Sequence, residues 1–133
     1  MQTDHRKPKQ ELTRAELEIM QILWKKGDAF VNEILEEMPD PKPAYNTVST
    51  IVRILEKKGM VGHRAYGKSH RYHPLIGKEE YTQSFMRNVM HNFFDNSFSQ
   101  LFSFFSAREN LSVGELEEIG RMARGIIEQR KTE

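Results

Sequence analysis

One stretch, PAYNTVSTIVRILEKKG at residues 43–59, constrains the fold of this chain more than any other. Its apolar residues recur at positions i, i+3, i+4 and i+7, which is the spacing of a buried stripe on an α-helix. They are Val48, Ile51, Val52 and Leu55. Gly59 follows two lysines and predicts the end of the helix, because glycine leaves the helical conformation easily and positive charge suits the last turn. We therefore expect a helix of about four turns, one side of which packs against a core.

The other side of this helix carries short side chains that form hydrogen bonds. They are Asn46, Thr47, Ser49 and Thr50, with Arg53 behind them. Such a surface fits into a narrow space and both donates and accepts hydrogen bonds, as the reading of base edges in the DNA major groove requires. The alternative is an ordinary amphipathic helix at a protein surface, and the helix alone does not distinguish the two.

Basic residues gather in the same part of the chain. Residues 42–74 contain seven lysines and arginines against one acidic residue, a net charge of +6, whereas residues 76–133 contain seven basic and nine acidic residues, a net charge of −2. A local basic patch beside a mildly acidic half is typical of a phosphate-contacting module joined to another part. The alternative is a solvated surface on which charge is unevenly distributed.

Two shorter helices are predicted ahead of the central one. Thr13 and Glu16 form a capping box that begins the first helix, and Gly27 ends it. A short strand is expected at residues 28–30 and a second helix at residues 31–38. Three prolines then end the second helix and stiffen the turn that leads into the third.

A basic hairpin is predicted after the central helix. Two strands at residues 62–66 and 70–74 flank the turn sequence Gly67-Lys68-Ser69. Three helices followed by such a hairpin are the order of a winged helix-turn-helix domain, in which the third helix lies in the major groove and the hairpin contacts the DNA backbone. We therefore expect a DNA-binding domain.

Three histidines, His63, His70 and His73, lie in the hairpin. Imidazole is a common metal ligand, so a metal site is one interpretation. Yet no carboxylate or cysteine lies near these residues in the sequence. We therefore expect the histidines to contact phosphates or to be exposed, and we expect no metal and no other cofactor.

After Gly77 the sequence becomes rich in phenylalanine and in helical patterns. A helix is predicted from residue 78 to about residue 102, and seven of the eight phenylalanines fall within residues 85–105. Ser112 and Glu115 form a second capping box ahead of a last amphipathic helix. These helices carry more apolar area than they can bury by themselves, which indicates packing between two copies of the chain. The alternative is that they fold back over the winged helix as a lid.

These patterns predict a mainly α fold class with a small β-hairpin. We expect a mobile tail at residues 1–10, a winged-helix DNA-binding domain at 11–76 and a helical dimerisation domain at 77–133. The expected dimer interface consists of Phe93, Phe94, Phe98, Leu101, Phe102, Ile119, Met122 and Ile126.

Several classes of protein are disfavoured by composition. The chain has no cysteine, which excludes disulfides and thiolate metal sites and fits a cytoplasmic location. No apolar run approaches the roughly 18 residues of a membrane span, and the polar N-terminus does not resemble a signal peptide. A Ser/His/Asp set, paired carboxylates in an apolar setting and a Gly-rich phosphate loop are all missing, so we do not expect an enzyme.

Three segments of the chain resemble the penicillinase-repressor family. They are LTRAELEIMQILW at residues 12–24, PAYNTVSTIVRILEKKGMV at 43–61 and YGKSHRYHPLIGKEE at 66–80. The resemblance implies a homodimeric winged-helix transcriptional repressor that binds a palindromic DNA operator, in a family associated with antibiotic resistance. It implies base contacts at Asn46, Thr47, Ser49 and Thr50. With it we expect DNA backbone contacts at Lys42, Tyr45, Arg53, Arg64, Lys68, His70 and Arg71.

The same resemblance bears on how the repressor is released. In antibiotic-responsive members a membrane sensor protease leads to cleavage of the dimerisation region, often at an Asn-Phe bond. The aligned position is Phe104-Phe105, where this chain has no asparagine, and Asn92-Phe93 lies about a dozen residues too early. Copper-responsive members carry a C-terminal cysteine cluster, and this chain has none. A sensor protease is thus an implied partner, with Phe104 and Phe105 as the candidate cleavage region.

Two classes of function remain after this comparison. The first is a DNA-binding transcriptional repressor, which the basic helix and hairpin favour. The second is a winged-helix module that contacts another protein without sequence-specific DNA binding. Salt-dependent binding to a duplex separates the two.

Overall fold

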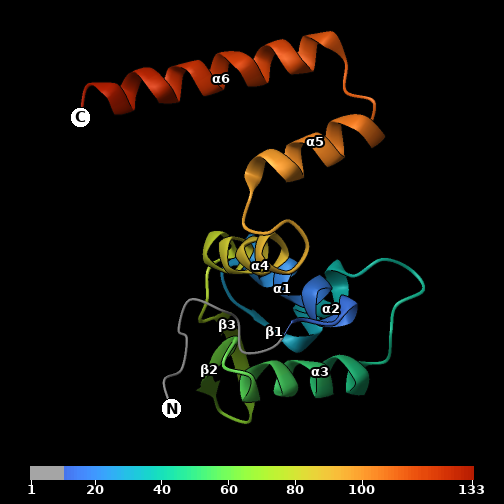
Figure 1. Ribbon diagram of the computed structural model, residues 1–133. Helices are drawn as coiled ribbons and strands as arrows, with labels where there is room; N and C mark the ends of the chain where they lie inside the picture. Colours follow the sequence, from blue (N-terminus) through green and yellow to red (C-terminus); the bar gives the residue numbers. More distant parts are fainter. Residues whose placement is uncertain (1–10) are drawn as a thin grey trace. The chain divides into compact units, whose positions relative to one another are not determined.

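The structure is a computed structural model that describes residues 11–133, so the tail expected at residues 1–10 lies outside the described residues. The chain divides into two compact units, the first ending at Asn88 and the second beginning at Val89. Figure 1 shows the order of the elements. They are α1 (Arg14–Lys26), β1 (Ala29–Phe30), α2 (Val31–Glu37), α3 (Tyr45–Lys57), β2 (Val61–Tyr66), β3 (Ser69–Pro74), α4 (Lys78–Phe93), α5 (Phe98–Arg108) and α6 (Val113–Lys131).

The first helix, α1, begins and ends where the local sequence predicts. The Thr13 hydroxyl accepts a hydrogen bond from the Glu16 backbone, and the Glu16 carboxylate accepts one from the Thr13 backbone, which satisfies two free N–H groups at the helix start. At the other end Gly27 adopts a φ of 91°, a conformation that disfavours other residues. One side of α1 contributes fully buried side chains to the core. They are Ile19, Met20 and Leu23.

A three-stranded antiparallel sheet, in the order β1-β3-β2, completes the fold of the first unit. β1 forms two residue pairs with β3, Ala29 with Tyr72 and Phe30 with Arg71. β2 and β3 pair over six positions and form the predicted hairpin, one residue longer at the start of each strand than expected. Its turn contains Gly67 at a φ of 63°. The winged helix-turn-helix prediction is confirmed, and we call this hairpin the wing.

The third helix, α3, packs its predicted apolar stripe into the core. Val48, Val52 and Leu55 are fully buried, and Ile51 packs against them. The core is shared with α1, α2, β2 and β3, because side chains from all five elements belong to one buried cluster. Burial of these side chains on α3 leaves its polar side facing away from the core.

The start of α4 belongs to the first unit. Tyr81 is 7% exposed and joins the core cluster, with its ring 6.0 Å from that of Trp24. The Trp24 indole donates a hydrogen bond of 2.8 Å to the Ile76 carbonyl. The structural division after Asn88 therefore lies beyond Gly77, while the assignment of dimerisation to residues 77–133 stays a prediction.

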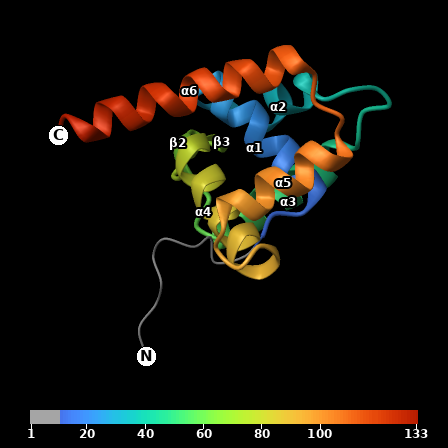
Figure 2. The ribbon, with the colours of Figure 1, turned by 45° about the horizontal axis from the view of Figure 1, so that its top comes forward.

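The prediction of a single helix from residue 78 to about residue 102 is wrong. Two helices, α4 and α5, occupy this stretch (Figures 1 and 2). Asp95 and Asn96 adopt φ values of 50° and 60°, which an α-helix cannot contain, and the Ser97 hydroxyl then caps α5 by accepting from the Gln100 backbone. The helix α5 also extends past Phe105 to Arg108.

The last helix, α6, begins at the predicted capping box. The Ser112 hydroxyl accepts from the Glu115 backbone at 3.1 Å, and the Glu115 carboxylate accepts from the Ser112 backbone at 3.0 Å. These hydrogen bonds lower the pKa of Glu115. Of the helices in residues 11–133, none combines the length and apolar character that a membrane crossing requires.

Candidate nucleic-acid interface

All four predicted base-reading residues lie on α3, on the side away from the core. Asn46, Thr47 and Thr50 are exposed, and Ser49 is half-buried. The geometry follows from the helical period, since burial of Val48 turns the residues on either side of it toward solvent. The side chains are uncharged and short, so that another surface can approach the helix backbone closely.

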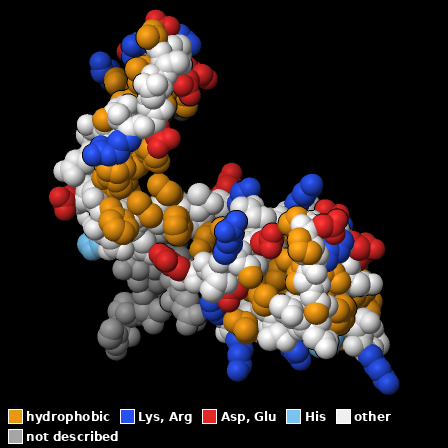
Figure 3. Space-filling model, turned by 90° about the vertical axis from the view of Figure 1, so that its right-hand side faces the viewer, with side chains coloured by type: hydrophobic (Ala, Val, Ile, Leu, Met, Phe, Trp, Pro, Cys, Tyr) orange, Lys and Arg blue, Asp and Glu red, His pale blue; other side chains and the backbone are white. Residues whose placement is uncertain are grey.

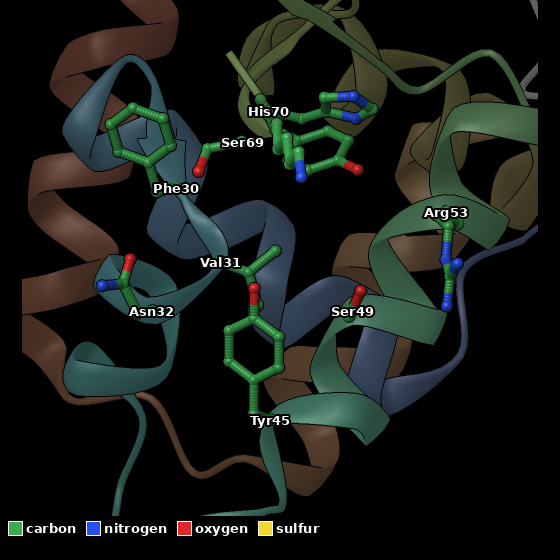
Figure 4. Close-up of a pocket in the computed structure, with 10 residues that line it drawn as sticks. Phe30, Val31, Asn32, Tyr45, Ser49, Arg53, Ser69 and His70 are labelled. Atoms are coloured by element: carbon green, nitrogen blue, oxygen red, sulfur yellow. The ribbon is translucent and has the colours of Figure 1, made fainter. Parts of the chain in front are cut away.

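A groove of about 440 Å³ runs beside this polar side of α3 (Figure 4). Three parts of the first unit line it: the β1–α2 junction, α3 and the wing. Its residues are Phe30, Val31, Asn32, Tyr45, Ser49, Arg53, Lys68, Ser69, His70 and Tyr72. Figure 4 shows Tyr45, Ser49 and Arg53 on one side and Phe30, Val31 and Asn32 on the other. Cationic side chains from α3 and from the wing thus border one hollow.

Asn32 is a groove residue that sequence reasoning missed. It is exposed near the start of α2, and the short helix shows no polar pattern that would set this asparagine apart. Its place in the groove depends on how α2 packs against α3 and the wing, which is a tertiary feature. An amide at this position can both donate and accept hydrogen bonds.

The predicted backbone contacts of the wing lie on two different faces of the sheet. His70 lines the groove, as does Tyr72 two residues later. Side chains alternate between faces along a strand, so Arg71 lies on the opposite face, and its cross-strand partner Arg64 shares that face. There the two arginines line a second, smaller pocket of about 150 Å³. Lys68 lies in the turn and lines the groove.

Arg71 forms two ion pairs on that opposite face. Its guanidinium lies 2.9 Å from an Asp28 carboxylate oxygen and 3.2 Å from Glu33 Oε1. The hydrogen bond from Arg71 is the main cause that holds the pKa of Asp28 below its usual range, and Asp28 in turn raises the pKa of Arg71. In residues 11–133 neither Arg64 nor Lys68 has an ion pair, so Arg71 differs from both.

Lys42, another predicted backbone contact, lies next to the end of α2. Its ammonium donates to the carbonyl oxygens of Glu36 and Met38 at 3.0 and 2.6 Å. These carbonyls lack partners within a helix that ends here, and lysine commonly satisfies such groups. Because both acceptors are neutral, the positive charge of Lys42 is not cancelled by them.

The wing histidines are not as isolated from carboxylates as their sequence neighbourhood indicates. His63 Nδ1 lies 2.5 Å from Glu56 Oε2 on α3, and the His63 ring stacks on that of His70 at 4.0 Å. No carboxylate lies close to these histidines along the sequence, but Glu56 lies close to His63 in the folded chain, because folding brings α3 against the wing. Within the described residues, no three His, Asp or Glu side chains are placed to hold a metal ion.

The second unit exposes much of its apolar surface (Figure 3). Of the predicted interface residues, five are exposed on this chain, with Phe93 at 75% and Met122 at 61%. The exposed five are Phe93, Phe98, Ile119, Met122 and Ile126. Phe94 and Phe102 are half-buried and Leu101 is buried within the unit. The helix α6 has no buried residue at all in this structure.

The predicted cleavage region lies inside α5. Phe104 and Phe105 are both exposed, at 44% and 50%, yet both belong to the helical backbone. The Phe104 ring contacts the Phe94 ring at 5.7 Å and lies under the Arg108 guanidinium at 4.3 Å. The non-helical connection between α5 and α6 is the stretch 109–112.

Comparison with known proteins finds that the chain is similar to repressors from bacteria. The profile of the penicillinase repressor family matches residues 12–124. The methicillin resistance regulatory protein MecI of Staphylococcus aureus (strain N315) is 30% identical over 110 residues, which cover 82% of this chain and 89% of that protein. The penicillinase repressor of Bacillus licheniformis is 25% identical over 122 residues, covering 91% and 92%. A solution structure of the DNA-binding domain of the repressor BlaI is 31% identical with a TM-score of 0.48, covering 56% of this chain and 89% of that one. By the extent of these sequence matches, the chain belongs to the penicillinase repressor family.

Proposed function

We propose that this protein is a DNA-binding transcriptional repressor that reads its operator with α3. The observation that carries the proposal is the exposed set of short polar side chains on α3 beside a groove lined by Arg53, Lys68 and His70. An exposed face of this kind can enter the major groove, while Arg53, Lys68 and His70 beside it can donate hydrogen bonds to phosphates. Membership in the penicillinase repressor family supports the same function.

The residues divide by chemistry into two roles. Side chains on α3 that both donate and accept hydrogen bonds read base edges: Asn46, Thr47, Ser49 and Thr50. The side chains around them that carry positive charge or can donate a hydrogen bond hold the sugar-phosphate backbone: Lys42, Tyr45, Arg53, Arg64, Lys68 and His70. Arg71 is left out of the second set because two carboxylates already bind its guanidinium.

Two substitutions test this division. Asn46→Ala should relax sequence preference and cost about 1–3 kcal/mol at one base pair. Lys68→Ala should weaken binding to every duplex alike and reduce the dependence of log K on log salt by about one. Lys131→Ala, which removes an exposed cation of α6, is the matched control and should change neither quantity.

Fluorescence anisotropy at several salt concentrations provides the measurement. The probes are a duplex selected by the wild-type protein from a random library and an unselected duplex of equal length. Equal losses on both probes for both variants would contradict the division of roles. A wild-type protein without salt-dependent duplex binding would instead favour a winged-helix module that binds another protein.

We also propose that the protein is a homodimer joined through its second unit. Ile119, Met122 and Ile126 follow one another at helical spacing on α6, and all three are exposed on the single chain. Contiguous exposed apolar surface of this kind marks an interaction site, and a two-fold dimer would cover the same face on both copies. The first units of the two copies would then bind the two half-sites of the operator. Once one of them is bound, the tether holds the other at a high effective concentration near its half-site.

Sedimentation velocity at micromolar concentration tests the dimer. Met122→Ala should weaken self-association, because removal of a buried methionine side chain costs about 2–5 kcal/mol. Operator affinity should fall in parallel, since a single unit lacks the tether. The neighbouring exposed Arg121→Ala is the control and should stay dimeric. A Met122→Ala protein that remains dimeric yet loses the operator would show that dimerisation is not what holds the complex.

Release from DNA is proposed to act through the same unit, with a sensor protease as one candidate partner. Cleavage requires that the chain leave its helix locally, and Phe104-Phe105 lies within α5. The connection at 109–112, where Asn110 adopts a φ of 56°, needs no such unfolding. We therefore expect proteinase K to cut first at 109–112, as read by mass spectrometry. A first cut between Phe104 and Phe105 would show that α5 opens more readily than the connection.

A further inference from the structure

Arg71 occupies the point where the wing leaves the sheet. β1 pairs with β3 at Tyr72 and Arg71, and beyond Arg71 toward the turn β3 pairs with β2 alone. Every residue from His63 to His70 is exposed. An isolated two-stranded hairpin is marginally stable in water, so the orientation of the outer wing depends on its contacts with the rest of the unit, which include the His63–Glu56 contact with α3 and the contacts of Arg71 at its base.

The guanidinium of Arg71 contacts one residue that precedes β1 in the chain and one that follows it. Asp28 precedes β1 and contacts one terminal nitrogen at 2.9 Å, while Glu33 in the first turn of α2 contacts the other at 3.2 Å. The Phe30 ring lies 4.9 Å from the guanidinium carbon and contacts the Tyr66 ring of β2 edge-on at 5.8 Å. Arginine presents its donors in a rigid fork, so two acceptors on different elements restrict both its position and its direction.

Glu33 connects this contact to the start of α2. The oxygen that binds Arg71 also accepts the Phe30 backbone N–H at 2.9 Å, at a helix start where Phe30 supplies no side-chain cap. One carboxylate therefore joins the wing to the junction of β1 and α2. Phe30, Val31 and Asn32 of that junction line the groove opposite α3.

The charges around Arg71 do not suit a phosphate contact. Arg71, Asp28 and Glu33 together carry a net charge of −1, whereas Lys68 in the turn has no ion pair within residues 11–133. A DNA phosphate would have to compete with two carboxylates for the guanidinium. The two carboxylates distinguish Arg71 from Arg64, which lies on the same face of the wing and has no ion pair within residues 11–133.

We propose that Arg71 is a positioning residue that fixes the wing to the β1–α2 junction through Asp28 and Glu33, so that Lys68 and His70 face α3 across the groove. The inference rests on the proposed DNA-binding function. Arg71 acts through the wing and makes no phosphate contact of its own.

Three variants separate positioning from simple electrostatics: Arg71→Ala, Asp28→Ala and the double variant. If Arg71 positions the wing through Asp28, the loss of Asp28 weakens duplex binding, although it removes a negative charge near DNA. We expect Asp28→Ala and Arg71→Ala each to weaken binding about twofold to fivefold, in the range that one partly exposed ion pair supports. The double variant should be no weaker than Arg71→Ala, because both changes break the same contact.

Salt dependence provides a second distinction. Arg71→Ala should leave the slope of log K against log salt unchanged, whereas Lys68→Ala lowers it by about one. Glu36→Ala removes an exposed carboxylate of α2 that forms no hydrogen bond or ion pair within residues 11–133, and it is the control for loss of negative charge. The probe is the selected duplex described above.

Amide hydrogen exchange of the free protein tests the wing directly, without DNA. Faster exchange at residues 63–70 in both Arg71→Ala and Asp28→Ala, with an unchanged core, would support the positioning role. Unchanged exchange there, tighter duplex binding by Asp28→Ala, or a reduced salt slope in Arg71→Ala would each overturn it. A wild-type protein that binds no duplex would reject the proposed function, while hydrogen exchange would still decide the role of Arg71. If Arg71→Ala fails to fold, Asp28→Ala gives the same decision.

Discussion

The contact between Glu16 and Lys58 allows a sharp prediction about how α3 is held. The Lys58 ammonium lies 2.7 Å from Glu16 Oε1, and the two side chains are 17% and 6% exposed. Glu16 lies in the first turn of α1, and Lys58 is the C-cap residue of α3. The pair therefore joins the end of α3 to the start of α1. The same carboxylate oxygen accepts the Thr13 backbone N–H at 2.9 Å.

The two partners should differ in the cost of their removal. Lys58→Met leaves a nearly buried carboxylate without its cation, and breaking a buried pair in this way typically costs about 3–5 kcal/mol. Because the Thr13 hydrogen bond remains and Lys58 is partly exposed, we expect about 2–3 kcal/mol here. Glu16→Gln keeps an acceptor for Thr13 and leaves an ammonium that can turn toward water, so we expect about 1 kcal/mol.

The lowered pKa of Glu16 determines how the stability of the protein changes with pH. Burial alone would raise the pKa of Glu16, but hydrogen bonds from Lys58 and Thr13 lower it below the ordinary value of 4.5. A carboxyl group whose pKa is lower in the folded state stabilises the fold above about pH 4.5, and this stability is lost as the pH falls through the folded-state pKa. The difference in unfolding free energy between wild type and Lys58→Met should therefore be largest near neutral pH and should shrink on acidification.

Urea unfolding followed by tryptophan fluorescence is the assay, because the single tryptophan, Trp24, lies in the first unit. Its contacts with Tyr81 and Ile76 make its emission sensitive to loss of this core. Equal costs for Lys58→Met and Glu16→Gln at neutral pH would refute the reasoning. A difference that persists unchanged at acid pH would refute the assignment to the ionised carboxylate.

Three further predictions concern the two units and the wing. A chain that ends at Asn88 should keep the urea midpoint of the first unit, whereas one that ends at Ile76 should unfold at lower urea because it lacks Tyr81 from the core. Gly67→Ala should weaken duplex binding with little change in core stability, because the φ of 63° at the wing turn costs a residue with a side chain about 1 kcal/mol; an unchanged affinity would contradict this. Ser112→Ala should reduce helix content by circular dichroism, since removal of such a cap costs a helix about 1 kcal/mol, and unaltered ellipticity would count against it.

Local signals explain where sequence reasoning about the helices succeeded and where it failed. Capping boxes at Thr13 and Ser112 are complete within four residues, so they can be found without knowledge of the fold. The break between α4 and α5 was missed because the apolar spacing continues across it. Only the backbone at Asp95 and Asn96, in a left-handed conformation that these residue types tolerate, interrupts the helix.

The sequence by itself determined the helical stripe of α3, its polar face, the wing and the family, because each depends on residues that are close together in the chain. Tertiary structure alone decided which charged side chains form ion pairs and which do not. It brought Glu33 to Arg71, Lys58 to Glu16 and Glu56 to His63 across element boundaries. It also placed the arginines of the wing on the face opposite to the groove. The physical reason is that an ion pair between separate elements depends on how those elements pack, and no local pattern records that packing.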